Sequence, residues 1–215
     1  MSHVLGTLAR AMRYTTFRFA LDPTPAQAAM LARHAGASRY AYNQSLRLVI
    51  DALAAKKIDP SVVVPWSGFD LINAFNAWKK TEDAGRVFVV AADGTSTKRV
   101  TGLAWRHEVS AQVFEEAAVD LGRALAAYSQ SRSGSRKGQR VGFPRRKRKG
   151  RCRDSFRLRN NKGKGSSSRI RIGETSLRSV TLQGSARSEF TMTPAGCGGC
   201  SVPSHRLTST PGSRS

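Results

Sequence analysis

Apolar and polar residues first alternate over residues 14–21, where Phe17 and Phe19 share one side. A period of two is typical of a strand. The Asp-Pro-Thr-Pro run that follows should end it. The sequence therefore predicts a first strand within residues 14–23.

A helix signal follows immediately. Thr24 can cap a helix, with Pro25 in its first position and Gln27 three residues after the cap. We expect this helix to end near His34, because Gly36 interrupts the pattern. A second helix is expected over residues 38–55. Its apolar stripe is Tyr42, Leu46, Val49 and Leu53.

Two helices separated by a glycine invite the description helix-turn-helix, in which the second helix reads the major groove. The alternative is an ordinary pair of packed helices. Groove reading would need exposed polar side chains on the second helix. The candidates are Arg39, Asn43, Gln44 and Arg47.

Further along, residues 60–65 form a proline-bounded linker, and residues 69–80 fit a short helix. Alternation and an Asp-Gly turn predict a hairpin near residues 86–101. The strongest helix pattern spans residues 103–129. Its apolar positions recur every three or four residues, which indicates core packing. They are Trp105, Val109, Val113, Ala117, Leu121, Leu125 and Tyr128.

The segment that follows this helix is strongly basic. Residues 132–171 contain 17 Lys or Arg against one acid, Asp154, which is +16 of the chain's net charge of +22. Such a density repels itself unless a polyanion neutralises it, which favours a nucleic-acid partner. A solvated tail or a membrane-surface patch is the alternative, but the run lacks the apolar helical face of a membrane helix.

Residues 130–154 show no periodicity and predict a basic flexible loop that orders on binding. Basic and apolar residues then alternate at residues 155–159 and 170–172, and a further short strand fits residues 180–182. These strands beside the loop would make a phosphate-contacting platform. The expected contacts are Arg136, Lys137, Arg140, Arg145, Arg146, Lys147, Arg148, Lys149, Arg151, Arg153, Arg157 and Arg159, with Arg39, Asn43 and Arg47 on the helix. Phe143 and Phe156 could stack on bases or anchor the loop.

The order of these motifs resembles the N-terminal half of the TnpB family of transposon-encoded proteins. The matching strings are Phe17-Arg-Phe-Ala-Leu-Asp-Pro-Thr-Pro-Ala-Gln27, Gly36-Ala-Ser-Arg-Tyr-Ala-Tyr-Asn43, Val141-Gly-Phe-Pro-Arg145, and Ile170-Arg-Ile-Gly173 with Val180-Thr-Leu182. The resemblance covers about residues 14–182. It implies an RNA-guided DNA endonuclease whose N-terminal part is a wedge-like β-barrel with an inserted helical recognition domain.

The expected organisation follows from this resemblance. It is an α+β fold: a leader (1–13), a first barrel strand (14–23), a helical recognition-like domain (24–129), the loop (130–154), barrel strands (155–182) and a disordered tail (183–215). The implied partners are guide-type RNA and target DNA. In the family, a RuvC-like domain holding Mg²⁺ and a zinc ribbon follow. We expect neither cofactor nor catalysis from this chain.

The family pattern stops at Leu182, where composition shifts to Gly, Ser, Thr and Pro. With GC-rich codons, reading from the third base of the Gln183 codon can give a continuation like that of the family. This favours the hypothesis of a frameshift near Gln183.

Cysteine and histidine suggest no site. Cys197 and Cys200 have the spacing of half a zinc site, but no second pair exists, so no metal is expected. Cys152 lies far from both in the sequence, so we expect no disulfide framework, and a cytoplasmic location is the default expectation. Two alternatives stay open: a standalone basic DNA- or RNA-binding regulator, and a full RNA-guided endonuclease interrupted by a sequencing error.

Overall fold

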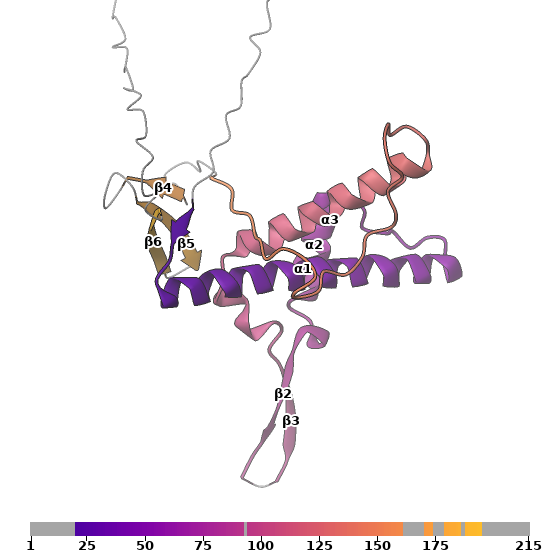
Figure 1. The fold of residues 1–215 in the computed structure, drawn as a ribbon. Coiled ribbons are helices and arrows are strands. Elements are labelled where there is room, and N and C mark those ends of the chain that lie inside the picture. Colours follow the sequence, from indigo (N-terminus) through magenta and orange to yellow (C-terminus); the bar gives the residue numbers. More distant parts are fainter. Residues whose placement is uncertain (1–19, 93, 161–169, 174–178, 186–187, 195–215) are drawn as a thin grey trace, which may run out of the picture.

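The computed structural model describes residues 20–92, 94–160, 170–173, 179–185 and 188–194. It is a mixed helix and sheet structure, as the predicted α+β class requires (Figure 1). The helices are α1 (Pro25–Ile58), α2 (Gly68–Trp78) and α3 (Ala111–Arg132), with 3-10 turns at Glu82–Ala84 and Ala104–His107. The strands are β1 (Leu21–Asp22), β2 (Arg86–Val90), β3 (Ser96–Val100), β4 (Ile170–Ile172), β5 (Val180–Ser185) and β6 (Ser188–Pro194).

Helix α1 begins as predicted but continues much further. The Thr24 backbone N–H donates to Gln27 Oε1 at 2.9 Å, and the Gln27 N–H donates to Thr24 Oγ1 at 3.4 Å, which completes the capping box. The predicted break at Gly36 is wrong, since the helix runs through it to Ile58. A mid-helix glycine costs only about 1 kcal/mol. The buried residues around it, His34, Ala35, Ala37 and Ser38, supply packing that outweighs this cost.

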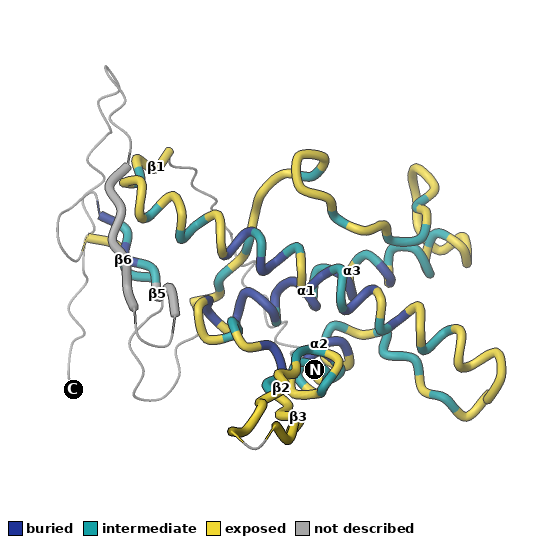
Figure 2. Tube along the Cα trace, turned by 90° about the horizontal axis from the view of Figure 1, so that it is seen from below, coloured by how far each residue is buried: buried dark blue, intermediate teal, exposed yellow. Residues whose placement is uncertain are grey.

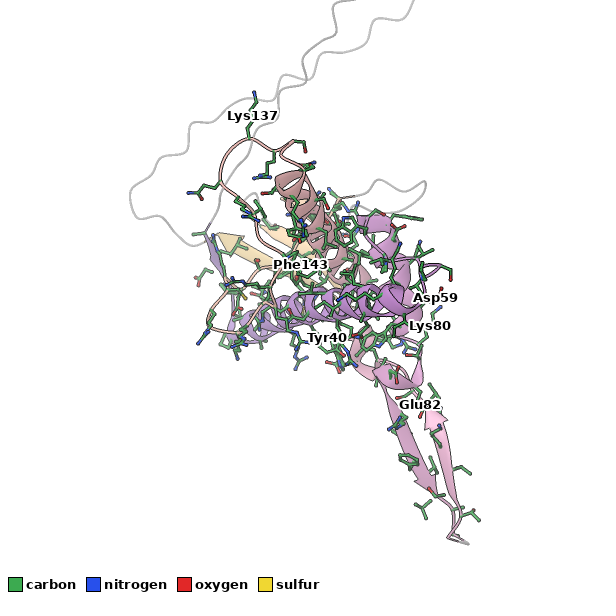
Figure 3. The ribbon with its side chains drawn as sticks, turned by 90° about the vertical axis from the view of Figure 1, so that its right-hand side faces the viewer. Tyr40, Asp59, Lys80, Glu82, Lys137 and Phe143 are labelled. Atoms are coloured by element: carbon green, nitrogen blue, oxygen red, sulfur yellow. The ribbon has the colours of Figure 1, made fainter. Side chains whose placement is uncertain are left out.

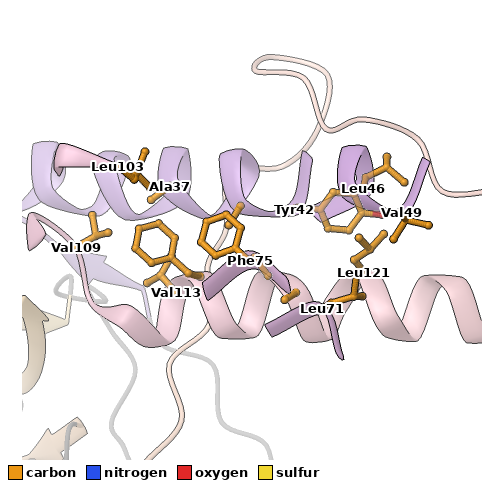
Figure 4. Packing of buried hydrophobic residues seen from close by; sticks show 14 of the residues in the cluster. Ala37, Tyr42, Leu46, Val49, Leu71, Phe75, Leu103, Val109, Val113 and Leu121 are labelled. Atoms are coloured by element: carbon orange, nitrogen blue, oxygen red, sulfur yellow. The ribbon is translucent and has the colours of Figure 1, made fainter. Parts of the chain in front are cut away.

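The core lies between α1, α2 and α3 (Figure 4). The predicted stripe on α3 is confirmed there, because Val113, Ala117, Leu121 and Leu125 are all buried. From α1 the core receives Ala37, Ala41, Tyr42, Leu46 and Val49, and from α2 it receives Leu71 and Phe75. The buried faces of α1 and α3 can be followed in Figure 2.

The start of α3 differs from the expectation of one helix from residue 103. The chain forms a 3-10 turn at Ala104–His107 before α3 begins after its N-cap, Ser110. The Ser110 N–H donates to Nε2 of the buried His34 at 3.4 Å, and the His34 Nδ1–H donates to the Met30 carbonyl at 2.8 Å. This imidazole therefore ties the start of α3 to α1.

The predicted hairpin is present as β2 and β3, which pair antiparallel with Arg86 opposite Val100 and Val90 opposite Ser96. It projects away from the helices, and every residue of both strands is exposed (Figure 1). The hairpin therefore adds nothing to the helical core.

The remaining strands form an antiparallel sheet in the order β1-β6-β5-β4, near the beginning of α1 (Figure 1). Within the described residues this is an open sheet and no closed barrel. Only Leu21 and Asp22 of the predicted first strand belong to it, and Tyr14 to Phe19 lie outside the described residues. The expectation of disorder after Leu182 differs from the structure, because β5 extends to Ser185 and β6 pairs with both β1 and β5.

Candidate nucleic-acid interface

The basic segment, residues 136–159, returns from the end of α3 along α1 and α3 (Figure 1). It has no regular secondary structure, but side chains hold it in place. Phe143, Phe156 and Leu158 pack against the helical core. The Val141 N–H donates to Ser131 Oγ at 2.9 Å. The segment predicted to be flexible thus has a defined path in the structure.

Asn43 and Tyr42 of α1 hold the middle of this segment at Lys147. The Asn43 carboxamide donates to the Lys147 carbonyl at 2.9 Å and accepts its backbone N–H at 2.8 Å. The Lys147 ammonium lies 4.1 Å from the centre of the Tyr42 ring, a cation–π contact. Burial, and secondarily the charge of Asp120, raises the pKa of Tyr42.

The two other predicted contacts on α1, Arg39 and Arg47, lie in different environments. Arg39 is mostly buried and forms an ion pair with Asp154, the single acid of residues 132–171. Arg47 is exposed and lies 3.4 Å from Asp51 one turn along the helix. The structure therefore brings Arg39 and Asn43 onto the basic segment, and it leaves Arg47 on the surface of α1.

Two of the predicted contacts are engaged with carboxylates of α3. Arg159 forms an ion pair with Glu116, and Arg157 lies 3.5 Å from Glu116 and 3.0 Å from Asp120. Glu116 is only 2% exposed, so its charge needs these cations. Arg157 and Arg159 fasten the end of the basic segment to α3.

The remaining cations face solvent, and none of them forms an ion pair with a carboxylate of the described residues. They are Arg136, Lys137, Arg140, Arg145, Arg146, Arg148, Lys149, Arg151 and Arg153. Lys137 projects away from the helices at the turn after α3 (Figure 3). The basic segment therefore presents a strongly cationic surface, and packing holds its backbone in place.

Four of these arginines gather around a hollow of about 510 Å³. Its apolar lining residues are Leu46 and Ile50 of α1 and Pro144. The arginines that line it are Arg145, Arg146, Arg148 and Arg151, and Cys152 lines it as well. We call this site the arginine hollow. A lining that combines guanidinium groups with apolar side chains suits a phosphate with an attached base.

The two phenylalanines predicted either to stack or to anchor are both half-buried. Phe143 meets the Tyr128 ring edge-on, with centroids 5.3 Å apart. The Phe156 ring centroid lies 5.2 Å from that of buried His34. Both rings anchor the basic segment in the structure. Phe143 also lines a second hollow. The other residues that line it were either expected in the core or not singled out as site residues in the sequence.

The residues that the structure describes offer few other groups that could form a metal site or another functional site. There, no group of three or more His, Cys, Asp or Glu residues could hold a metal ion. Cys197 and Cys200 lie outside the described residues, and Cys152 is a free thiol. No described helix is both long and apolar enough to cross a membrane.

Comparisons with known proteins support the resemblance found in the sequence. Residues 12–57 match the family described as "Helix-turn-helix domain", of the OrfB IS605 type. Two proteins from different strains of Mycobacterium tuberculosis, each named "putative RNA-guided DNA endonuclease", are 32% identical to this chain over 138 residues. The matched stretch makes up 64% of this chain and 27% of each relative. The helix-turn-helix match includes most of α1, which the structure shows as one uninterrupted helix.

Proposed function

Since the chain belongs to the TnpB family, we propose that it is a transposon-associated nucleic-acid-binding protein whose basic segment contacts phosphates. The observation that carries this is the set of nine exposed cations between Arg136 and Arg153, which pair with no carboxylate of the described residues. They stand on a segment that α1 and α3 hold in place. Cations on a backbone that is held in place lose less conformational freedom when they meet a phosphate backbone than those of a disordered tail.

The partner we propose is guide-type RNA together with target DNA, as the family resemblance and the names of the relatives suggest. In this proposal the sheet β1-β6-β5-β4 is part of a wedge-type barrel. The recognition role falls to α1, α2 and α3. Arg39 and Asn43 of α1 are not free to make base-specific contacts, because both side chains already contact the basic segment.

The test is the salt dependence of binding. The slope of log affinity against log salt counts the phosphates that cations neutralise, at about 0.7–0.9 per contact. Replacing Arg145, Arg146 and Arg148 together by Gln should weaken binding to a structured RNA and reduce the slope by about 2–3. A matched variant replaces Arg33, Lys80 and Arg99, three exposed cations outside the segment.

The control variant removes the same charge and should change the slope much less. Equal losses in the two variants would show that binding follows net charge alone, which contradicts a localised interface. Salt-independent binding of the wild-type chain would contradict the proposal altogether. Duplex DNA titrated under the same conditions separates DNA binding from RNA binding.

A further inference from the structure

A second hollow, of about 600 Å³, lies where α1 and α3 end. We call it the aromatic hollow. Three rings line it, Trp66, Tyr128 and Phe143, together with three cations, Lys56, Lys57 and Arg132. Its volume lies within the range of about 300–1,000 Å³ that is usual for small-molecule sites. No carboxylate is among its described lining residues.

The rings are fixed by their surroundings. Trp66 packs against the helical core, and the next residue, Ser67, is the N-cap of α2. Tyr128 meets Phe143 edge-on, and the Arg132 guanidinium donates to the Tyr128 hydroxyl at 3.2 Å. All three rings are half-buried, so each has part of its surface anchored and part open. Such rings need little ordering when a flat ligand arrives.

The position of the cations has a second explanation. Lys56 and Lys57 lie in the last turn of α1 and Arg132 in the last turn of α3, where positive charge offsets the helix dipole. Helix ends do not require aromatic neighbours, however. A hollow that combines anchored rings with cations matches the way single-stranded nucleic acid is bound, by stacking of bases and neutralisation of phosphates.

The two hollows also adjoin each other. Phe143 lines the aromatic hollow, and Pro144, the next residue, lines the arginine hollow. On α1, Ile50 belongs to one and Lys57 to the other. Their separation of seven residues places them on the same side of the helix, about 10 Å apart along its axis. One strand could therefore contact both hollows.

We propose that the aromatic hollow binds an unpaired base of a single-stranded nucleic acid by stacking, with its phosphates held by Lys56, Lys57 and Arg132. This inference rests on the proposed function, because the same strand would continue onto the arginines of the basic segment. It adds a site whose selectivity is for exposed bases and not for charge alone.

Trp66 provides a direct readout, since a base stacked in this hollow quenches its fluorescence. The chain is titrated with three single-stranded probes of equal length: oligouridylate, oligothymidylate and an abasic phosphodiester strand. Tryptophan emission and the anisotropy of a labelled probe are followed together. We expect quenching with one or both of the base-containing strands and none with the abasic strand. Comparing oligouridylate with oligothymidylate shows whether RNA or DNA is preferred.

Variants sharpen the test. Trp66→Leu should weaken binding to the base-containing strand about fivefold or more, the equivalent of losing one stacking contact, and leave the abasic strand unaffected. Trp66→Phe should retain binding and lose the quenching. Phe69→Leu is the matched aromatic control, because Phe69 is 72% exposed and lies outside the hollow. Lys57→Gln should weaken binding more than Lys80→Gln, which makes the same charge change elsewhere.

Wild-type binding without quenching by either base-containing strand overturns the inference and leaves the proposed function standing. The inference is likewise overturned if Trp66→Leu weakens binding of the abasic strand as much as that of the others. If Trp66→Leu does not fold, the wild-type quenching and the two lysine variants decide the question. Absence of any salt-dependent binding by the wild-type chain overturns both proposals.

Discussion

The side-chain amide of Asn43 pairs with the main chain of Lys147 in both directions, donating to its carbonyl at 2.9 Å and accepting its N–H at 2.8 Å. The two residues are 104 positions apart in the chain. A carboxamide can mimic a peptide group, so this contact fixes the backbone of the basic segment as a neighbouring strand would. The nine exposed cations therefore follow a path that one residue of α1 helps to set.

Replacing Asn43 by Ala should release this path without unfolding the helices. Two half-buried hydrogen bonds are lost, each worth about 0.5–1.5 kcal/mol. We expect trypsin to cleave the chain near Lys147 about tenfold faster, because cleavage follows the population of the opened segment. Mass spectrometry of the first fragments identifies the bond that is cut.

Gln44→Ala is the matched control, since the neighbouring side chain is also half-buried and on α1. Its cleavage pattern should resemble that of the wild-type chain. Identical cleavage of the Asn43→Ala variant would show that the core contacts of Phe143 and Phe156 suffice to hold the segment.

Local signals in the sequence predicted the helical part well. The capping box at Thr24, the hairpin around residues 86–101 and the α3 stripe depend on residues close together in the chain, and all are present. The break at Gly36 was wrong because local propensity cannot register burial against α3. The continuous helix matters for the site, since it places Asn43 and Lys57 on one rigid element.

Gly36→Ala tests this continuity directly. A Cβ at residue 36 would meet only the Arg39 guanidinium, at 3.9 Å, which is ordinary contact. If the helix is unbroken, alanine should raise the free energy of unfolding by about 0.5–1 kcal/mol. Urea denaturation followed by circular dichroism measures the change. A loss of stability would instead indicate a turn at this position.

Gly122→Ala should have the opposite effect. The start of α2 crosses α3 so closely that a Cβ at residue 122 would lie 2.6 Å from the Gly68 nitrogen and 2.9 Å from its Cα. Backbone atoms cannot move aside as side chains do, so we expect a loss of about 1–3 kcal/mol despite the better helix propensity. Under the same denaturation protocol, a neutral or stabilising result would contradict this helix crossing.

The cap of α2 predicts a pH dependence. Hydrogen bonding from Ser67, by its side chain and then by its backbone, lowers the pKa of Asp70 below its ordinary value of 3.8. A lowered carboxyl pKa contributes stability above the ordinary value, and this is lost as pH falls through the lowered one. Asp70→Asn should therefore be less stable than the wild-type chain at neutral pH. The gap should close as the pH falls through the lowered pKa of Asp70; a gap independent of pH would rule out the carboxylate as its source.

The candidate site was less predictable, because charge alone does not reveal which cations have partners within the chain. Arg157 and Arg159 look like Arg145 and Arg146 in the sequence. What distinguishes them is Glu116 of α3, which lies more than 40 residues away in the sequence and which the structure buries. The aromatic hollow was missed for a similar reason: Trp66, Tyr128 and Phe143 come from three separate segments.

The ion pairs of Glu116 allow a structural role of Arg159 to be distinguished from a role in nucleic-acid binding. Arg159→Ala leaves a carboxylate that is 2% exposed with Arg157, at 3.5 Å, as its remaining ion-pair partner among the described residues. We expect the free energy of unfolding to fall by about 1–3 kcal/mol, the cost of an undercompensated buried charge. Adding Glu116→Leu should recover part of this loss, because the charge is removed and an apolar group fills its place. RNA affinity corrected for the folded fraction should change less than for Arg146→Ala. If Arg159→Ala instead lowered affinity at unchanged stability, Arg159 would be a phosphate contact and its pairing with Glu116 would be secondary.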